Sequence, residues 1–313
     1  MTVEPVANVS RAATEPTADA QTVAAAAGFR VESPRIDAHH HVWDLRVRDQ
    51  PWTRGLAPLR RSFAMADLRP ALRAHRIAGT VVVQTVDLPE ETPELLTLAA
   101  HDPDVAGVVG WVDLRAPDVA DRLAALRSLD GGDRLVGIRH QVQSEPDPGF
   151  LDRAAVRRGL AAVAAAGLCY DMVVTPSQLP AVARAVGELP QLRFVLDHGG
   201  KPAIRAGEIE PWRRDISRIA AAPNVAAKLS GLITEADPLA WTIPDVARYG
   251  RVLVDEFGPG RLMFGSDWPV CLLRAGYRDV LVSAEAALQD CSDAERDQVF
   301  GGTAAAWYRL APR

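Results

Sequence analysis

The sequence is poor in lysine and in cysteine, and it has no long hydrophobic run. Of its 313 residues, 35 are basic, yet Lys201 and Lys228 are the only lysines. The 40 acidic residues bring the formal charge to −5, and the arginines are dispersed along the chain. Nucleic-acid binding needs a concentrated basic face, so we expect no nucleic-acid partner.

The three cysteines, Cys169, Cys271 and Cys291, are far apart and form no CxxC pair. This spacing excludes a disulfide scaffold or a structural zinc cluster and favours a reducing compartment. No apolar run approaches the roughly 20 residues that span a bilayer, and no charged start precedes an apolar segment as in a secretory signal. We therefore expect a cytoplasmic protein with no membrane partner.

The remaining composition is typical of a globular protein. Hydrophobic residues make up 48% of the chain and charged residues 24%, which is enough apolar material for a large core. Residues 1–33 are rich in Ala, Thr, Val, Glu and Pro, and they are predicted to form a flexible N-terminal tail. Residues 34–313 are predicted to form one domain.

Within that domain, short β-branched runs alternate with stretches of helical periodicity. The predicted strands are Arg35–Trp43, Gly79–Val86, Val105–Leu114, Leu135–Val142, Leu168–Val174, Arg193–His198, Asn224–Leu229 and Arg261–Asp267. The predicted helices are Leu68–Arg76, Asp118–Leu129, Ala154–Ala166, Pro180–Val186, Trp212–Ala221, Ile243–Phe257 and Tyr277–Ala287. Eight such units indicate an α/β fold, a closed (β/α)8 TIM barrel. An open doubly wound sheet is the alternative, but no GxGxxG follows the first strand.

Function in such a barrel sits at the C-terminal ends of the strands. The first predicted strand contains Asp37, His39, His40 and His41. Because side chains alternate along a strand, His39 and His41 point the same way and offer a pair of imidazole ligands. Asp37 shares that parity and is a candidate for orienting one of the rings. The alternative is a surface cluster of histidines.

Two later strands also end in ionisable residues. His198 ends the sixth strand and precedes Gly199 and Gly200, which permit a ligand to approach closely. Asp267 ends the eighth strand, next to the first, where it is placed to bind metal and to exchange a proton with water. A buried core histidine and a helix N-cap are the respective alternatives. Together His39, His41, His198 and Asp267 suit one Zn²⁺ or similar ion with a position open to water.

A second set of residues is predicted to bind substrate. Arg139, His140 and Gln143 follow one another on and after the fourth strand, and arginine suits planar recognition of a carboxylate or carbonyl. The other members of this predicted set are Gln84, Lys201 and Trp43. Because lysine is so rare in this chain, a lysine indicates a position that arginine cannot fill. On this basis Lys201 is predicted to lie in the pocket, and Lys228 is a weaker candidate for a pocket residue.

The sequence contains no motif of a serine hydrolase or of a phosphate-binding loop. The chain has no GxSxG elbow and no GxxxxGK[ST] phosphate loop. The paired carboxylates Glu90 and Glu91 are expected to be solvated in a loop.

The motifs together resemble the amidohydrolase superfamily. The segments are Ile36–Asp44, Gly137–His140, Gln143 with Glu145–Asp147, Asp197–Pro202, Lys228–Gly231 and Phe264–Pro269. In their order they are similar to the amidohydrolase-2 branch, which holds sugar lactonases and 2-pyrone-4,6-dicarboxylate hydrolase. The resemblance runs from about Arg35 to the C-terminus.

This resemblance implies a TIM barrel of the metal-dependent hydrolase type that opens a small cyclic ester. His39 and His41 match the first-strand pair, His198 the later histidine and Asp267 the eighth-strand aspartate. Dinuclear members carry a bridging lysine or glutamate on the fourth strand, which this chain lacks. The resemblance therefore implies one divalent metal, with Zn²⁺ as first candidate. Catalysis without metal stays open, because the branch also contains metal-free hydrolases.

The resulting hypothesis is hydrolysis of a sugar-acid lactone, with a small molecule as the partner. Asp267 and His198 are the predicted catalytic residues. The alternatives are a decarboxylase or C–C hydrolase on the same scaffold, and a non-catalytic ligand-binding barrel. Assembly into a homo-oligomer is left open.

Overall fold

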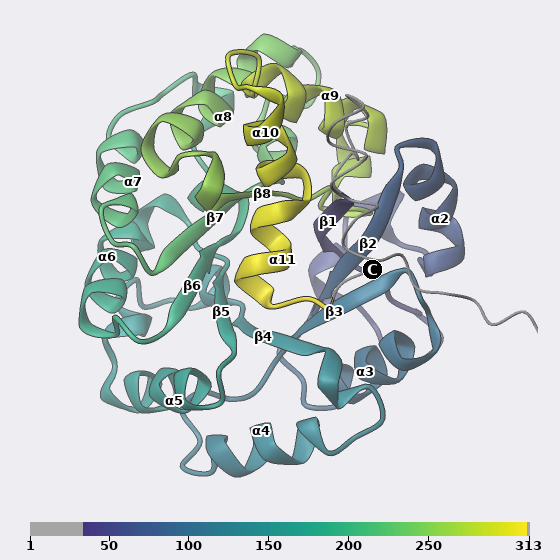
Figure 1. The fold of residues 1–313 in the computed structure, drawn as a ribbon, viewed down its shortest axis with the longest axis vertical. Helices are drawn as coiled ribbons and strands as arrows, with labels where there is room; N and C mark the ends of the chain where they lie inside the picture. Colours follow the sequence, from purple (N-terminus) through teal and green to yellow (C-terminus); the bar gives the residue numbers. More distant parts are fainter. Residues whose placement is uncertain (1–33, 312–313) are drawn as a thin grey trace, which may run out of the picture. The chain divides into compact units, whose positions relative to one another are not determined.

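A computed structural model describes residues 34–311, so the predicted tail at 1–33 lies outside the described residues. The described chain forms one parallel sheet of eight strands in the order β1 to β8 (Figure 1). The strands are β1 (Arg35–His40), β2 (Ile77–Val83), β3 (Val105–Gly110), β4 (Leu135–His140), β5 (Cys169–Met172), β6 (Arg193–Leu196), β7 (Val225–Leu229) and β8 (Leu262–Phe264). The sheet curls into a barrel because the segment after β8 returns to β1: Asp267 N–H donates to His39 O at 2.8 Å, and His41 N–H donates to Trp268 O at 2.7 Å.

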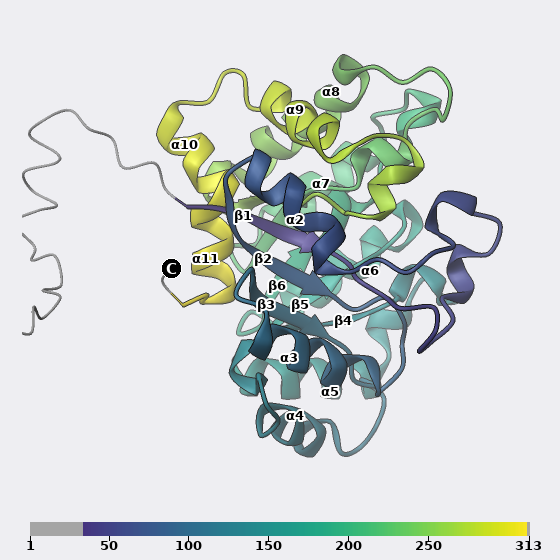
Figure 2. The same cartoon turned by 90° about the vertical axis from the view of Figure 1, so that its right-hand side faces the viewer.

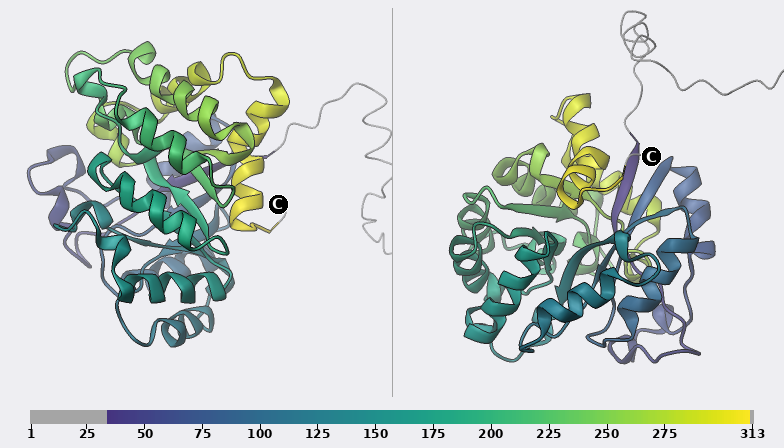
Figure 3. Two further views of the ribbon diagram at one scale, coloured as in Figure 1. Left: turned by 90° about the vertical axis from the view of Figure 1, so that its left-hand side faces the viewer. Right: turned by 60° about the horizontal axis from the view of Figure 1, so that its bottom comes forward.

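Helices follow the strands and cover the outside of the barrel. They are α2 (Met65–Ala74), α3 (Glu91–His101), α4 (Val119–Arg127), α5 (Ala154–Ala165), α6 (Leu179–Glu188), α7 (Trp212–Ala220), α8 (Ile243–Phe257), α9 (Tyr277–Ala287), α10 (Asp293–Asp297) and α11 (Thr303–Tyr308). Figure 2 shows the strands between α8 and α9 on one side and α3 to α5 on the other, and Figure 3 shows the C-terminal helices, in yellow, at one end of the barrel. The (β/α)8 barrel predicted from the sequence is confirmed. None of the helices within residues 34–311 combines the length and the apolar character needed to cross a membrane.

The core has two parts, as this architecture requires. The larger part lies between the helices and the outer face of the strands. The smaller part fills the barrel with inward side chains such as Val81, Val109 and Met263, and Ala304 and Tyr308 of α11 join it. Helix α11 therefore closes the end of the barrel where the strands begin, and the opposite end is free to hold a site.

The boundaries show why the sequence prediction worked and where it erred. Helices α8 and α9 have the predicted bounds, and Thr242, whose hydroxyl accepts from Asp245 N–H, caps the start of α8. Helix α3 was missed, and Glu91, expected in a loop, begins it and is buried. Its carboxylate accepts hydrogen bonds from the backbone N–H groups of Thr85 and Val86 and from the Thr85 hydroxyl. Pro93 lies in the first turn of α3, where a missing N–H costs no helical hydrogen bond.

Most predicted strands run two to four residues past the observed ends, because the polar residues at those ends lie in the loops that follow the ladder. His41, Gln84 and Asp267 are examples of this displacement.

Candidate active site

His39 and His41 point together, as alternation predicts. The Nε2 atoms of the two rings are 3.2 Å apart, and both rings are buried. His41 Nδ1 lies 2.7 Å from Val83 O. Because a carbonyl only accepts, Nδ1 carries the proton and the Nε2 lone pair faces the site. Asp37 does not orient a ring: its carboxylate accepts from the backbone N–H groups of His39 and Ser266, and so joins β1 to the segment after β8.

His40 points the opposite way, out of the barrel, where Nε2 is 3.0 Å from Thr80 Oγ1. Burial, together with the neighbouring His41 ring, lowers the pKa of His40 from 6.5 to about 3. The unfolded chain takes up this proton near pH 6.5 and the folded chain only near pH 3. The unfolded state thus binds more protons within this interval, and stability falls as the pH falls through it.

We therefore expect His40→Asn to flatten the acid side of the stability profile. As the pH falls from about 6.5 to about 3, the free energy of unfolding of the wild-type protein falls through this one group. Chemical denaturation at a series of pH values measures the slope of unfolding free energy against pH. His101→Gln is the matched control, because that side chain is 72% exposed. Equal slopes in wild type and His40→Asn would contradict the prediction.

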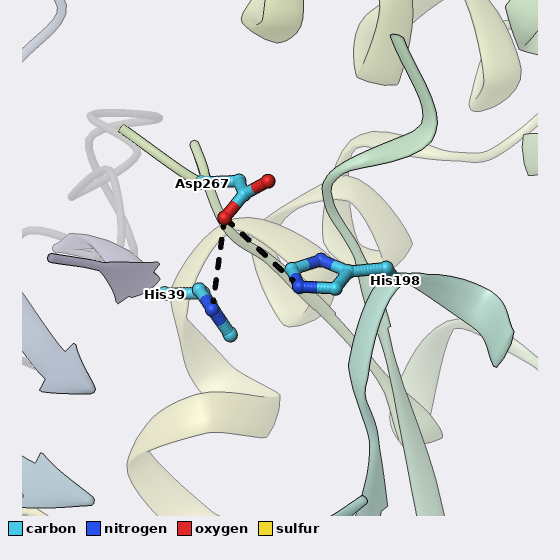
Figure 4. Close-up of side chains that lie close together, drawn as sticks. All are labelled: His39, His198 and Asp267. Carbon is cyan, nitrogen blue, oxygen red and sulfur yellow. Dashed lines mark ion pairs between the residues drawn. The ribbon is translucent and has the colours of Figure 1, made fainter. Parts of the chain in front are cut away.

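His198 and Asp267 reach the same point from the other side of the barrel. His198 lies in the single turn Asp197–Gly200 after β6, and Asp267 follows β8. Both have positive φ, 55° and 54°, a region that non-glycine residues adopt rarely and mostly at functional sites. Figure 4 shows His39, His198 and Asp267 converging. Asp267 Oδ1 is 3.5 Å from His41 Nε2, 3.8 Å from His39 Nε2 and 3.9 Å from His198 Nε2.

Two glycines make room for these rings. A Cβ on Gly265 would lie 2.6 Å from His39 Cβ, and a Cβ on Gly231 would collide with the His198 ring. Gly231 also has a φ of 62°, which favours glycine. The glycines of the motifs Lys228–Gly231 and Phe264–Pro269 are thus explained by the site rather than by a turn alone.

The protonation states favour ligand binding. Burial is the main cause that lowers the pKa of His198 to about 4 and holds that of His39 well below its usual range, so both imidazoles are neutral at neutral pH. Burial alone would raise the pKa of Asp267, but the adjacent rings of His198 and His41 hold it below its usual value. The site therefore offers neutral imidazoles and an ionised carboxylate.

These residues open into a cavity of about 380 Å³ at the C-terminal face of the barrel. Of the residues predicted to bind substrate, Arg139, Gln143 and Lys201 line it, as do His41, His198 and Asp267. His39 lies directly behind this lining. The cavity also has an apolar side, which includes Trp52, Val173 and Val270.

Three predicted substrate residues lie outside that cavity. His140 stacks on Phe150 with ring centroids 4.7 Å apart, accepts from Trp111 Nε1 at Nδ1 and contacts Glu145 through Nε2. Trp43 packs against Trp52, and its indole N–H donates to Arg61 O at 2.7 Å. Gln84 is fully buried beneath Arg139, where its Oε1 accepts from Nη2 at 3.1 Å.

The structure also adds residues that the sequence reasoning missed. Asp87 lies in the cavity wall, and its Oδ1 accepts from Gln84 Nε2 at 3.0 Å and from Gln141 N–H at 3.2 Å. Burial raises the pKa of Asp87 above its usual value. Ser230 Oγ lies 2.9 Å from His198 Nδ1. Both residues follow strand ends, so extending the search a few residues past each apolar run would have found them.

A parallel eight-stranded barrel with histidines and an aspartate at its C-terminal face defines this chain as a barrel hydrolase. The family model described as Amidohydrolase matches residues 36–310, so the chain belongs to the amidohydrolase family. It is 41% identical over 288 residues to an L-fucono-1,5-lactonase of Burkholderia multivorans, covering 88% of this chain and 96% of the relative. A second L-fucono-1,5-lactonase, from Burkholderia ambifaria, is 40% identical over 285 residues, with the same coverage of both chains.

A solved structure supports the same family. The crystal structure of an amidohydrolase from Burkholderia multivorans with bound zinc has a TM-score of 0.83 and 40% identity, and the match covers 89% of this chain and 100% of that one. The expected family, fold and hydrolase class are confirmed.

Proposed function

We propose that this chain hydrolyses the lactone of a small sugar acid, with L-fucono-1,5-lactone as the first candidate substrate. The observation that carries the proposal is the position of Asp267, an ionised carboxylate within 3.9 Å of three imidazole Nε2 atoms at the wall of a substrate-sized cavity. Family membership and about 40% identity to two lactonases support it. Acid release from L-fucono-1,5-lactone by the purified protein tests it, and failure with this and every other aldonolactone would contradict it.

In the proposed reaction, Asp267 acts first as a base and then as an acid. It accepts a proton from the water whose oxygen attacks the lactone carbonyl carbon. When the ring C–O bond breaks, Asp267 returns this proton to the departing alkoxide, so the product is the open hydroxy acid. In the absence of an ion, His198 is placed to donate to the carbonyl oxygen through Nε2, with the Ser230 hydroxyl donating to Nδ1. As a ligand of an ion, His198 would use the Nε2 lone pair, and Nδ1 would donate to Ser230 Oγ instead.

We also propose that His39, His41, His198 and Asp267 hold one Zn²⁺ ion. The donor atoms of His39, His198 and Asp267 all lie within 4.8 Å of one another. Zinc bonds of about 2.0–2.1 Å in tetrahedral geometry place donor atoms about 3.4 Å apart, close to the separations of 3.2 Å and 3.5 Å that His41 makes with His39 and Asp267. The neutral rings and ionised carboxylate are the protonation states that ligation needs. Such an ion, when bound, polarises a carbonyl and lowers the pKa of bound water.

We expect the purified protein to contain about one equivalent of zinc per chain, measured by elemental analysis. Chelator dialysis should remove it, and zinc should return it with a rise in the unfolding temperature, because the ion binds the folded state. His198→Asn should lower the zinc content at least tenfold, and His101→Gln should leave it unchanged. Zinc content that is equal in the two variants would contradict the proposed ligands.

A further inference from the structure

Lys228 lies inside the barrel with no exposed surface. Its Nζ is 2.6 Å from Asp171 Oδ2, 3.0 Å from Asp197 Oδ1 and 3.0 Å from His39 Nδ1. Asp171 Oδ2 accepts a hydrogen bond from the ammonium, Asp197 Oδ1 forms an ion pair with it, and His39 Nδ1 lies within hydrogen-bond distance. A planar guanidinium directs its donors differently, which accounts for a lysine in a chain that otherwise uses arginine.

The charges around Lys228 are balanced. Arg139 Nη1 is 3.1 Å from Asp197 Oδ2, so two cations face the two carboxylates Asp171 and Asp197 inside the barrel. His39 lies between the cations, with Lys228 at Nδ1 and Arg139 Nη1 3.3 Å from Nε2. Asp197 Oδ1 is also 3.3 Å from His39 Nδ1. The ring is thus held from one edge by Lys228 and Asp197 together.

The far side of this cluster is fixed by α11. Tyr308 donates its hydroxyl to Asp171 Oδ2 at 2.6 Å, and its ring centroid lies 5.5 Å from Lys228 Nζ. Lys228, Asp171, Asp197 and Tyr308 do not line the cavity. Among the residues that Lys228 contacts, His39 is the one whose ring reaches Asp267, at 3.8 Å.

We infer that Lys228 is a positioning residue: its ammonium, paired with Asp171 and Asp197, holds Asp197 Oδ1 beside His39 Nδ1 and so keeps the ring with Nε2 facing Asp267. The inference rests on the proposed lactonase function for its kinetic test. A purely structural role is the competing explanation, since buried ion pairs are often replaceable by apolar side chains without loss of stability. The two explanations differ in the kcat of the molecules that fold. Loss of a positioning residue lowers this kcat, whereas loss of a purely structural residue lowers only the amount of folded protein.

The test compares Lys228→Met with Tyr308→Phe, which removes another hydrogen bond to the same Asp171 oxygen but leaves the ammonium beside His39. We expect Lys228→Met to lower kcat on L-fucono-1,5-lactone about 10- to 100-fold, with KM changed less than about threefold. Tyr308→Phe should change both less than about threefold. Circular dichroism and thermal unfolding establish the folded fraction, to which the rates are normalised.

A second readout does not need a substrate. The ¹⁵N shifts of the His39 ring nitrogens, assigned by their loss in His39→Asn, should move in Lys228→Met and not in Tyr308→Phe. Inactivity of the wild-type protein would defeat the proposed function alone, while the shifts would still test the positioning role. Unchanged kcat together with unchanged ¹⁵N shifts in folded Lys228→Met would overturn the inference.

If Lys228→Met does not fold, the double variant Asp171→Asn, Lys228→Met removes one charge of each sign. We expect it to fold and to show the low kcat and the shifted His39 signals. A double variant with the wild-type kcat would show that the ammonium is not needed, and would also overturn the inference.

Discussion

Replacing Asp267 with asparagine is expected to lower kcat for lactone hydrolysis by about 10³-fold or more. The carboxylate is ionised at neutral pH, because the adjacent rings of His198 and His41 hold its pKa low despite burial. Asparagine has nearly the same shape but cannot accept a proton, and loss of a positioned general base costs about 10²- to 10⁴-fold. The same change removes one of the proposed ligands of the ion. Initial rates of acid release, measured over a range of lactone concentrations, give kcat and KM separately.

The control for this prediction is Asp87→Asn, because Asp87 is the other carboxylate in the wall of the cavity. Asp87 is hydrogen bonded to Gln84 and Gln141, and it is expected to act on binding through KM. A wild-type kcat in Asp267→Asn, with the protein folded, would remove Asp267 from the proposed chemistry. Equal losses of kcat in both variants would show that charge in the cavity, rather than a base at position 267, sets the rate.

Much of this site could be predicted because each ionisable residue ends an apolar run. The rule that barrel sites lie at strand ends turned His39, His41, His198 and Asp267 into one candidate cluster without knowledge of any distance. The structure places all four within a few ångströms. The opposite orientation of His40 could also be predicted, because successive side chains of a strand point to opposite faces.

The cluster around Lys228 could not be predicted in the same way. Asp171 and Lys228 each stand alone in an apolar strand, which indicates inward side chains but does not pair them. Their pairing depends on the register of several strands and on α11, whose Tyr308 contacts the cluster from the far end of the sequence. The role of Gly231 and Gly265 could not be predicted for the same reason. The histidines that they accommodate, His198 and His39, come from other strands.

The charges around the cavity bear on the choice among reactions. Two of the described lining residues carry a guanidinium or ammonium group, and each faces a carboxylate. Arg139 Nη1 is 3.1 Å from Asp197 Oδ2, and Lys201 Nζ is 3.6 Å from Glu235 Oε1. Asp87 and Asp267 add negative charge to the wall itself. An anionic substrate, which a pyrone-dicarboxylate hydrolase or an aromatic decarboxylase requires, would meet carboxylates here.

An uncharged polyhydroxy lactone suits the same wall. Asp87, Gln141 and Gln143 offer acceptors and amide donors for hydroxyl groups, and Trp52 offers an aromatic surface for the C–H face of a sugar ring. Arg139 lines this wall, and its guanidinium also donates to Asp197 and to Gln84. Its predicted role in binding substrate stays a prediction.

We therefore expect kcat/KM for L-fucono-1,5-lactone to exceed that for 2-pyrone-4,6-dicarboxylate by at least about 10³-fold. Asp87 lies outside the proposed ligand set, so its charge is not offset by a bound ion. Like charges brought together in a binding site cost several kcal/mol, and each 1.4 kcal/mol is a factor of ten. Acid release for the lactone and ultraviolet absorbance for the pyrone give both values with one enzyme preparation. Asp87→Asn should narrow the ratio, because it removes one carboxylate that repels the dicarboxylate and one acceptor that binds the lactone. Comparable efficiency on the two substrates, or a ratio unmoved in Asp87→Asn, would show that the charge of the wall does not select the substrate.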